Sequence, residues 1–340
     1  MALIGFGNVG RAFARLLESK REELRRGYGL DWRVTAIGTR SHGGALDPAG
    51  IDLREALRLV ESDKALAPLA ALPAPDDPTE FLRQSGAAVL FETTPVNYKT
   101  GQPALDHIRA ALGLGMHVVT ANKGPVVHGY DELKALARSK GRHFYFESAV
   151  MDGAPIFSMW RAALPAAKVN GFRGILNSTT NLILTLMEAG HTFDEAVAQA
   201  QTIGVAETDP SGDILGWDAA VKVAALTTVL MDSPLTPDQV ARQGIERINP
   251  REIAAARRSG RRWKLICKAE RRDDGVEASV GPEMIPPEDP LFTVMGTSSS
   301  ITFDSDVLGK LTITEEDPGP TTTAFGLLAD FINAVRTPVD

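Results

Sequence analysis

The sequence predicts an α/β protein in which a doubly wound parallel sheet is followed by a second domain of the α+β type. Three observations support this fold class. Apolar strands alternate with helix-period segments in the first third, a glycine-rich turn follows the first strand, and a run of helices precedes four strands in the last third. The chain has 340 residues, too many for one ordinary core, so two or three domains are expected.

The composition excludes several classes of protein. The chain is 44% hydrophobic and 23% charged with a net charge of −7, and it has no basic stripe that would suit nucleic acid. No apolar run approaches the roughly 20 residues that span a bilayer, and the N-terminus lacks a signal-peptide pattern. The single Cys267 is expected in a buried strand, and no metal-spaced Cys/His set occurs. We therefore expect a cytoplasmic protein without a membrane or nucleic-acid partner.

The first third contains the strands of the predicted parallel sheet. The first strand begins at residue 2, and a helix with one apolar face follows over 9–24. A second strand is expected over 32–40. Nearly continuous apolar strands, typical of buried parallel strands, follow at 87–95 and 116–122, with a helix over 101–114 between them.

The remaining two thirds are predicted to mix strands and helices. Thr192 and Glu195 have the spacing of a capping box at a helix start. The expected strands are 143–150, 168–176, 263–270, 276–281, 299–304 and 308–314. The expected helices are 153–164, 179–189, 193–203, 214–231, 250–258 and 321–336.

The turn after the first strand, GFGNVG, has the G-x-G-x-x-G spacing of a Rossmann-type dinucleotide-binding fold. The first glycine allows a tight turn, the second lets the backbone approach a pyrophosphate, and the third lets helix and strand pack closely. Because this turn joins a strand to an amphipathic helix, it predicts dinucleotide binding rather than a plain turn. The residues expected at the cofactor are Gly5, Gly7, Asn8, Val9 and Gly10.

Residues 207–222, ETDPSGDILGWDAAVK, concentrate four carboxylates before one lysine. These carboxylates would repel one another unless positive charge lies among them. Asp218 and Lys222 are four residues apart, so on a helix both side chains project from one face. The pattern indicates a site that holds cations.

Plainer interpretations of these residues are also open. Asp218 and Lys222 could form a surface ion pair worth about 0.3–0.5 kcal/mol. Asp213 could cap a helix, and the polar run NSTTN at 177–181 could do the same or could offer hydroxyl and N–H groups to a substrate carboxylate. For Asp209, which precedes a proline, a role in a turn is sufficient.

Three long motifs follow one another in the middle of the chain. GFRGILNSTTNLIL, from residue 171, is followed by EAVAQAQTIGVAETDP and then DILGWDAAVK. In order and spacing these motifs closely resemble the signature of homoserine dehydrogenases. TANKGP at 120–125, FETTP at 91–95, DPAGIDL at 47–53 and DPL at 289–291 resemble the same family. The resemblance spans essentially the whole chain.

The resemblance implies an NAD(P)-dependent enzyme that interconverts L-aspartate 4-semialdehyde and L-homoserine in threonine, isoleucine and methionine biosynthesis. A lysine ammonium can stabilise and protonate the alkoxide that forms when hydride reaches the aldehyde. The residues assigned in this way are Lys222, Lys123 and Asp218 for catalysis, Glu207, Asp213 and Thr179 for the substrate, and Thr93 and Thr94 for the cofactor. The alternatives are a related dehydrogenase of another hydroxy-amino acid, or a non-catalytic nucleotide-binding sensor.

The resemblance also implies the roles of the domains. Residues 1–135 would bind the dinucleotide, residues 136–314 would bind substrate, carry catalysis and form the dimer, and the segment 315–340 would pack back on the first domain. A homodimer built partly from residues 135–150 and the C-terminal segment is implied. The family form would be short and single-function, without an ACT or aspartate kinase domain.

Two segments depart from the family pattern. MDGAP at 151–155 stands where the family has a glycine-rich turn whose main-chain carbonyls can hold a monovalent cation such as Na⁺. EEDPGPTTTAF at 315–325 lacks the glycines of a loop that lies near the cofactor in the family. The carbonyls that would hold the cation are those of Glu147, Val150, Asp152 and Ala154.

The end of the second strand predicts the choice of cofactor. An acidic residue there accepts the ribose 2′-hydroxyl of NAD, whereas an arginine accommodates the 2′-phosphate of NADP. This strand runs into Thr39, Arg40, Ser41 and His42, with no acid, while Asp31 precedes the strand. We therefore expect Arg40 and Ser41 to bind the phosphate, so that NADP is preferred to NAD.

Overall fold

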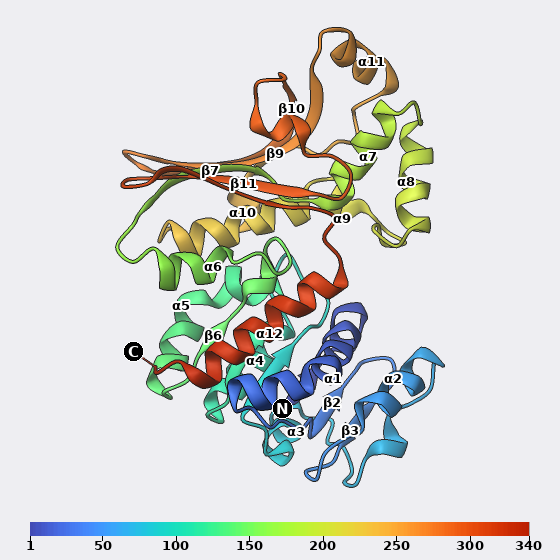
Figure 1. The fold of residues 1–340 in the computed structure, drawn as a ribbon, viewed down its shortest axis with the longest axis vertical. Coiled ribbons are helices and arrows are strands. Elements are labelled where there is room, and N and C mark those ends of the chain that lie inside the picture. The colour runs from blue at the N-terminus through green and yellow to red at the C-terminus, as the bar shows by residue number, and fades with distance from the viewer. Residues whose placement is uncertain (340) are drawn as a thin grey trace. The chain divides into compact units, whose positions relative to one another are not determined.

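The computed structural model describes residues 1–339, which form two compact units (Figure 1). Unit 1 comprises residues 1–155 and the C-terminal segment that begins at Gly319, and unit 2 comprises residues 156–318. The first unit extends past residue 135, where we expected it to end, because strand β6 (Phe144–Tyr145) pairs with the sheet of unit 1. Asp340, the last residue of the expected C-terminal segment, lies outside the described residues.

Unit 1 contains the predicted doubly wound sheet, with the strand order β3-β2-β1-β4-β5-β6. Five strands are parallel, whereas the edge strand β3 (Gly44–Leu46) is antiparallel to its neighbour. This order places the change of winding direction between the first and fourth strands, where such folds bind dinucleotides. The parallel strands are β1 (Ala2–Ile4), β2 (Ala36–Gly38), β4 (Val89–Glu92), β5 (His117–Thr120) and β6.

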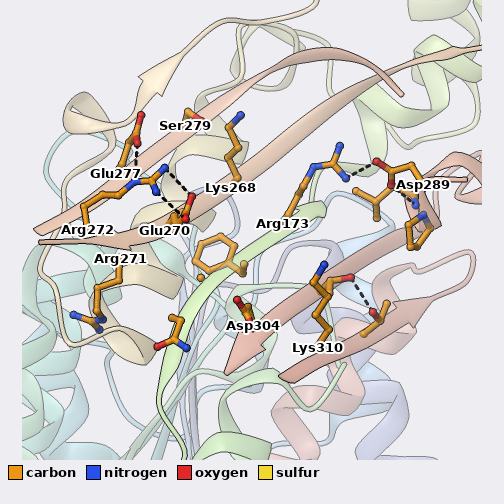
Figure 2. Close-up of a pocket in the computed structure, with 18 of the residues that line it drawn as sticks. Arg173, Lys268, Glu270, Arg271, Arg272, Glu277, Ser279, Asp289, Asp304 and Lys310 are labelled. Carbon is orange, nitrogen blue, oxygen red and sulfur yellow. Dashed lines mark hydrogen bonds and ion pairs between the residues drawn. The ribbon is translucent and has the colours of Figure 1, made fainter. Parts of the chain in front are cut away.

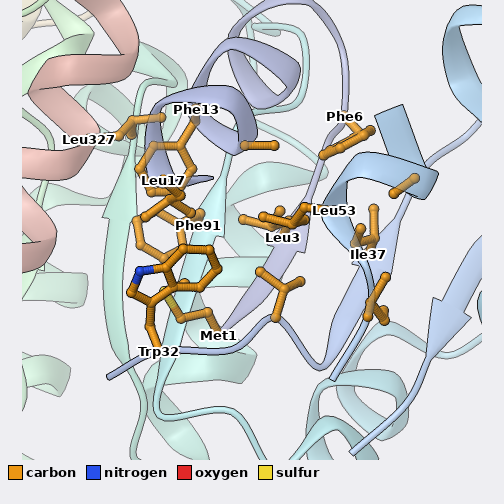
Figure 3. Close-up of a cluster of buried hydrophobic side chains, with 14 of the residues drawn as sticks. Met1, Leu3, Phe6, Phe13, Leu17, Trp32, Ile37, Leu53, Phe91 and Leu327 are labelled. Carbon is orange, nitrogen blue, oxygen red and sulfur yellow. The ribbon is translucent and has the colours of Figure 1, made fainter. Parts of the chain in front are cut away.

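Six α-helices of the described chain belong to unit 1, and the last one completes its core. Helix α12 (Pro320–Arg336) packs beside α1 (Asn8–Tyr28), as Figure 1 shows. The ring of Phe91 lies 4.4 Å from Phe13 and 5.7 Å from Phe331, measured between centroids, inside the apolar cluster of Figure 3. The other four helices are α2 (Leu53–Glu61), α3 (Pro78–Ser85), α4 (Ala104–Gly113) and α5 (Lys123–Ser139).

The segment 143–164 differs from the prediction. The expected long strand is only β6, followed by a 3₁₀ turn, η2 (Glu147–Ala149). The strand stops because the backbone N–H of Glu147 donates to the carboxylate of Asp330 on α12, at 2.6 Å, instead of joining the sheet. The expected helix over 153–164 is a single turn, α6 (Ile156–Ser158), followed by a π-helical turn, η3 (Met159–Ala163).

Unit 2 is an α+β unit, as predicted. Its sheet has the order β12-β11-β7-β9-β10-β8 and is antiparallel except for the pairing of β8 with β10. Cys267 is fully buried in β9, which confirms its expected place. The strands are β7 (Val169–Ile175), β8 (Ala241–Arg242), β9 (Arg262–Arg272), β10 (Gly275–Ile285), β11 (Ser299–Ser305) and β12 (Gly309–Glu315).

The helices of unit 2 that follow β7 agree with the prediction except around Gly216. Thr192 and Glu195 form the predicted capping box. The helix expected over 214–231 is split in two because Gly216 adopts a left-handed conformation, with φ of 78°. The helices are α7 (Ser178–Glu188), α8 (Phe193–Thr202), α9 (Ser211–Ile214), α10 (Trp217–Leu230) and α11 (Pro250–Arg258), with 3₁₀ turns η4 (Pro237–Gln239) and η5 (Pro290–Thr293).

Across residues 1–339, none of the helices is both long and apolar enough to cross a membrane. Residues 144–150, part of the segment 135–150 expected to help form a dimer, are buried inside unit 1. Their side chains are therefore committed to the core of the subunit and offer no open surface to a partner.

Candidate active-site residues

The glycine turn of unit 1 has the geometry of a cradle for a pyrophosphate. Gly5 has φ of 94°, and a Cβ built there would lie 2.6 Å from the carbonyl carbon of Thr93. A Cβ on Gly10 would lie 2.7 Å from the carbonyl oxygen of Gly5. At Gly7, by contrast, a Cβ would meet no atom within 4 Å. Gly5 and Gly10 are therefore needed for close packing, whereas Gly7 leaves space in which a ligand can approach the backbone.

The same turn presents the positive end of α1. Gly7 and Asn8 are exposed at the start of this helix, whose first turn contains no acidic residue. Val9 is half-buried and packs against the core of unit 1. Free backbone N–H groups at a helix start bind anions, so these residues fit the pyrophosphate of a dinucleotide.

Thr93 and Thr94 lie beside the glycine turn. The hydroxyl of Thr93 donates to the carbonyl oxygen of Gly5 at 2.9 Å. The hydroxyl of Thr94 donates to Oε1 of Glu92, a carboxylate that is completely buried. Glu92 had no assigned role in the sequence, although it lies inside the FETTP motif. Its burial depends on the tertiary structure and leaves no local pattern.

The Glu92 carboxylate connects this loop to the start of α5. Its Oε2 accepts a hydrogen bond from Thr120 at 3.3 Å. The side chain of Asn122 donates to the carbonyl oxygen of Thr94 at 3.0 Å and accepts from the N–H of Gly124 at 3.0 Å, so it caps α5. Lys123, the first residue of α5, is therefore carried at the carboxyl edge of the sheet, where ligands of such folds bind.

The loop after β2 contains the residues expected to select the cofactor. Arg40 is exposed and makes no hydrogen bond or ion pair with any other described residue. Ser41 is exposed, and its hydroxyl contacts Nδ1 of His42 at 2.7 Å. The carboxylate of Asp63 lies 3.3 Å from Nε2 of His42 in the same loop. Arg40 is thus available to an anion, with one carboxylate close to the same loop.

In unit 2 the acidic segment folds around an amide. Nδ2 of Asn177 donates to Oδ1 of Asp213 at 2.6 Å and to Oδ2 of Asp218 at 3.0 Å. Asp218 also pairs with Lys222, with Nζ and Oδ2 2.9 Å apart, and Lys222 donates to the carbonyl oxygen of Leu176 at 2.7 Å. The i,i+4 pair exists as expected, but it is not a surface pair, because the side chains of Asp218 and Lys222 are only 11% and 16% exposed.

The cluster concentrates negative charge. Burial raises the pKa of Asp213, the nearby Asp218 carboxylate raises it further, and the hydrogen bond from Asn177 partly opposes the shift. Two carboxylates and one lysine leave a net negative charge beside the helix start, which suits an added ammonium group. Asn177 was considered only as part of a capping run, although its amide joins the two carboxylates.

The other predicted residues of unit 2 have different surroundings. Glu207 is exposed, and its backbone carbonyl oxygen accepts a hydrogen bond from the side chain of Gln201 at 3.2 Å. The carboxylate of Asp209 accepts from the N–H of Ser211 at 3.1 Å, which confirms its role in a turn. Thr179 is buried and donates its hydroxyl to the carbonyl oxygen of Val205 at 3.3 Å. Asp213 lies within α9 and does not cap α10, whose N-cap is Gly216.

The turn expected to hold a monovalent cation is bound to α12. Ser148 donates its hydroxyl to the carbonyl oxygen of Thr323 at 2.7 Å, and Asp152 accepts from the hydroxyl of Thr323. Met151 and Asp152 both have positive φ, 54° and 52°. Because the side chains of this turn are engaged with α12, any cation there would be held by main-chain oxygens.

A hollow of about 880 Å³ on the sheet of unit 2 contains none of the predicted site residues (Figure 2). Several of its charged side chains form ion pairs with one another or with Glu283. Arg173 lies 2.8 Å from Asp289, Lys268 lies 3.0 Å from Glu283, and Arg272 pairs with two glutamates. This arrangement has the character of a paired polar surface and offers no group prepared for hydride or proton transfer.

Comparison with known proteins identifies the family. The homoserine dehydrogenase family matches residues 155–332, and the NAD binding domain of homoserine dehydrogenase matches residues 5–147. The chain belongs to the homoserine dehydrogenase family. Among homoserine dehydrogenases, an NAD(+)-dependent enzyme of Pseudomonas canavaninivorans is 38% identical over 98% of this chain and 95% of its own length. The homoserine dehydrogenase of Methanocaldococcus jannaschii is 35% identical over 97% of each chain.

Solved structures of homoserine dehydrogenases have the same fold. A putative homoserine dehydrogenase from Archaeoglobus fulgidus superposes with a TM-score of 0.85 at 30% identity, over 98% of both chains. A hyperthermophilic archaeal homoserine dehydrogenase in complex with NADPH has a TM-score of 0.82 at 29% identity, over 100% of this chain and 98% of that one. The nucleotide-binding fold expected from the glycine turn is therefore confirmed at the level of the family.

Proposed function

We propose that this protein is an NAD(P)-dependent homoserine dehydrogenase that reduces L-aspartate 4-semialdehyde reversibly to L-homoserine, in threonine, isoleucine and methionine biosynthesis. The single observation that carries this proposal is the cluster in which Asn177 joins Asp213 and Asp218 beside Lys222. That cluster offers negative charge to an amino group and an ammonium to an oxygen. Membership of the family and the glycine cradle of unit 1 support it.

We assign a separate role to each residue near the cluster. Asp213 and Glu207 hold the substrate ammonium, and Thr179 contacts the substrate at the start of α7. Bound NAD(P)H supplies the hydride to the aldehyde carbon. As the carbonyl electron pair moves to oxygen, Lys222 or Lys123 stabilises the alkoxide and donates the proton that completes the alcohol. Asp218 holds the Lys222 ammonium, with 2.9 Å between Oδ2 and Nζ.

The cofactor would be held by the chain's own anion-binding groups. Gly5, Gly7 and Gly10 form the cradle, Asn8 and Val9 begin the helix that faces the pyrophosphate, and Thr93 and Thr94 border the turn. We propose that NADP binds more tightly than NAD because Arg40 is exposed and no acid follows β2 directly. Relatives differ in this respect, since one is named NAD(+)-dependent and another is in complex with NADPH.

Two further proposals concern the turn at 147–154 and the oligomer. A monovalent cation such as Na⁺ would be held by carbonyl oxygens of Glu147, Val150, Asp152 and Ala154, since α12 engages the side chains of this turn. Replacing Na⁺ by a bulky organic cation should then lower activity. The protein would be a homodimer, as the resemblance to the family implies. Light scattering in solution measures this state.

The decisive experiment is an absorbance assay at the nicotinamide band. Homoserine is compared with a panel of other hydroxy-amino acids, with NAD and with NADP. Turnover that is selective for homoserine supports the proposal. Turnover with another hydroxy-amino acid alone would indicate a related dehydrogenase, and cofactor binding without turnover would indicate a nucleotide sensor.

A further inference from the structure

Lys264 is a buried cation in unit 2 that the proposed reaction does not use. It lies on β9, its side chain is 1% exposed, and it makes no ion pair with the rest of the described chain. Nζ donates to Oδ1 of Asn181 at 2.8 Å and to the carbonyl oxygen of Val294. The carboxylate of Glu188 acts on Lys264 from a distance but pairs directly with Arg262. Burial of an ammonium without a directly bonded carboxylate costs free energy. A reason other than stability is therefore needed for a lysine at this place.

The contact with Lys264 fixes the orientation of the Asn181 amide. Because an ammonium can only donate, it must face the amide oxygen. Nδ2 of Asn181 is then directed to the carbonyl oxygens of Val294, at 3.3 Å, and Ser298, at 3.2 Å. The lysine and the amide together tie α7 to β9 and to the segment 294–298.

The contacts of Lys264 and Asn181 hold the first turn of α7, which lies next to the proposed site. Asn177 is the N-cap of α7, and Asn181 lies four residues further on, at the end of the first turn. The N–H of Asn181 donates to the carbonyl oxygen of Asn177 at 3.2 Å. Asn177 in turn holds Asp213 and Asp218 at its other end. A path of direct contacts therefore runs from Lys264 to the acidic cluster.

We propose that Lys264 is a positioning residue that, through Asn181, fixes the first turn of α7 and so the placement of Asn177 and Thr179 for homoserine. This inference rests on the proposed function. The lysine does not touch the reacting atoms, so its loss should act mainly on substrate binding. The cofactor cradle belongs to unit 1 and should bind its ligand as before.

The test compares Lys264→Met with a matched variant on the same strand. Lys264→Met keeps the length and apolar stem of the side chain but removes the donor. Lys268→Met removes an exposed lysine that pairs with Glu283 at 3.0 Å. We expect Lys264→Met to raise the KM for homoserine by roughly tenfold, since small misplacements at a site have effects of this size or larger. The Kd of Lys264→Met for NADP, measured by calorimetry, should stay within twofold of wild type. The KM for homoserine and the Kd for NADP of Lys268→Met should do the same.

A second variant separates positioning from folding. Asn181→Ala keeps the bond of Lys264 to Val294 but cuts the tie to α7, so it should raise the KM to the same extent, and the double variant should be no worse than either single one. If Lys264→Met does not fold, Asn181→Ala decides alone. Additive effects in the double variant, or a KM within twofold of wild type in the folded single variants, would overturn the proposal.

Hydrogen–deuterium exchange gives a readout that does not depend on activity. The amides of residues 178–183 should exchange faster in Lys264→Met than in wild type, and at the wild-type rate in Lys268→Met. Unchanged exchange in Lys264→Met would contradict the inference. Wild-type protein without turnover of homoserine would instead refute the proposed function, while the exchange data would still report whether Lys264 fixes α7.

Discussion

The hydroxyl of Thr323 on α12 donates a hydrogen bond to Oδ1 of Asp152. Each residue belongs to one of the two segments that depart from the family pattern, EEDPGPTTTAF and MDGAP. The turn at 148–153 and the start of α12 approach each other closely at two glycines. A Cβ on Gly326 would lie 2.4 Å from Oγ of Ser148, and one on Gly153 would lie 2.3 Å from the carbonyl oxygen of Thr322. The two departures are thus parts of one packed junction in unit 1.

This junction should contribute measurably to stability. Thr323→Val removes the donor to a carboxylate and should lower the free energy of unfolding by about 1–2 kcal/mol. Thr321→Val, at an exposed position of the same helix, should change it little. Urea unfolding of both variants, of Asp152→Ala and of the double variant measures the coupling. Losses that simply add would show that Thr323 and Asp152 do not stabilise each other.

Substitution of Lys222 tests the assigned acid. Lys222→Ala should lower kcat by at least about a hundredfold, the effect of losing acid–base assistance. Lys168→Ala, which removes an exposed lysine of the same unit, is the control and should leave kcat unchanged. Retention of more than half of the wild-type kcat by a folded Lys222→Ala variant would remove this residue from the mechanism.

Asp213, whose proposed role is to bind the substrate, should lower the free energy of unfolding at neutral pH. Its pKa is raised above the ordinary value of 3.8, so the native state holds the proton more tightly than the unfolded state, and stability is lost as pH rises above that value. Asp213→Asn should therefore be more stable than wild type at pH 7, with a difference that shrinks toward pH 3, and should bind homoserine less well. Urea titrations at the two pH values decide, and a variant less stable at pH 7 would contradict the assignment.

Arg40 should determine the preference for NADP. Arg40→Ala removes the exposed guanidinium that would pair with the 2′-phosphate, so the Kd for NADP should rise while that for NAD stays the same. Calorimetry with both cofactors, on wild type and variant, measures this directly. Equal wild-type constants, or a preference that survives the substitution, would refute the role of Arg40. Tight binding need not give fast turnover, so the kinetic constants are measured separately.

Lys264 should make stability depend on pH in the alkaline range. Burial lowers its pKa from 10.5 to about 8. Between these values the unfolded chain binds the proton and the native state does not, so this residue makes unfolding less favourable as pH rises. The shift corresponds to about 3 kcal/mol. Between pH 8 and 10.5, the free energy of unfolding of wild type should rise relative to that of Lys264→Met. A difference between the two proteins that stays constant across this range would argue against a buried ammonium with a lowered pKa.

Local patterns predicted the elements whose signals are contained in a few neighbouring residues. The capping box at Thr192 and the glycine turn after the first strand are of this kind. The antiparallel edge strand β3 and the helices α2, α3 and α5 were missed. The strand expected over 143–150 is much shorter, because its extent depends on a distant partner, the Asp330 carboxylate that ends β6.

The same limit applies to the site, of which local spacing predicted only a part. The spacing of Asp218 and Lys222 was sufficient to place them on one helix face, and the structure confirms that pair. Glu92 and Lys264 were given no role, and Asn177 was considered only as part of a capping run, because their importance comes from burial and from contacts with residues far away in the chain. Lys264 reads in sequence as one more charge in a basic strand, yet it is among the largest fully buried side chains.

The discontinuity of unit 1 has a consequence for how the protein is made. Residues 156–318 form unit 2 without help from the rest of the chain's core, so this unit can be completed as soon as it leaves the ribosome. Unit 1 begins earlier but must wait for α12, whose Leu327 and Phe331 fill the cluster around Phe13 and Phe91. Until those residues are synthesised, Phe13 and Phe91 lack the apolar neighbours that α12 provides. The half that is translated first is thus the half that matures last, and it is the part most exposed to chaperones and to aggregation.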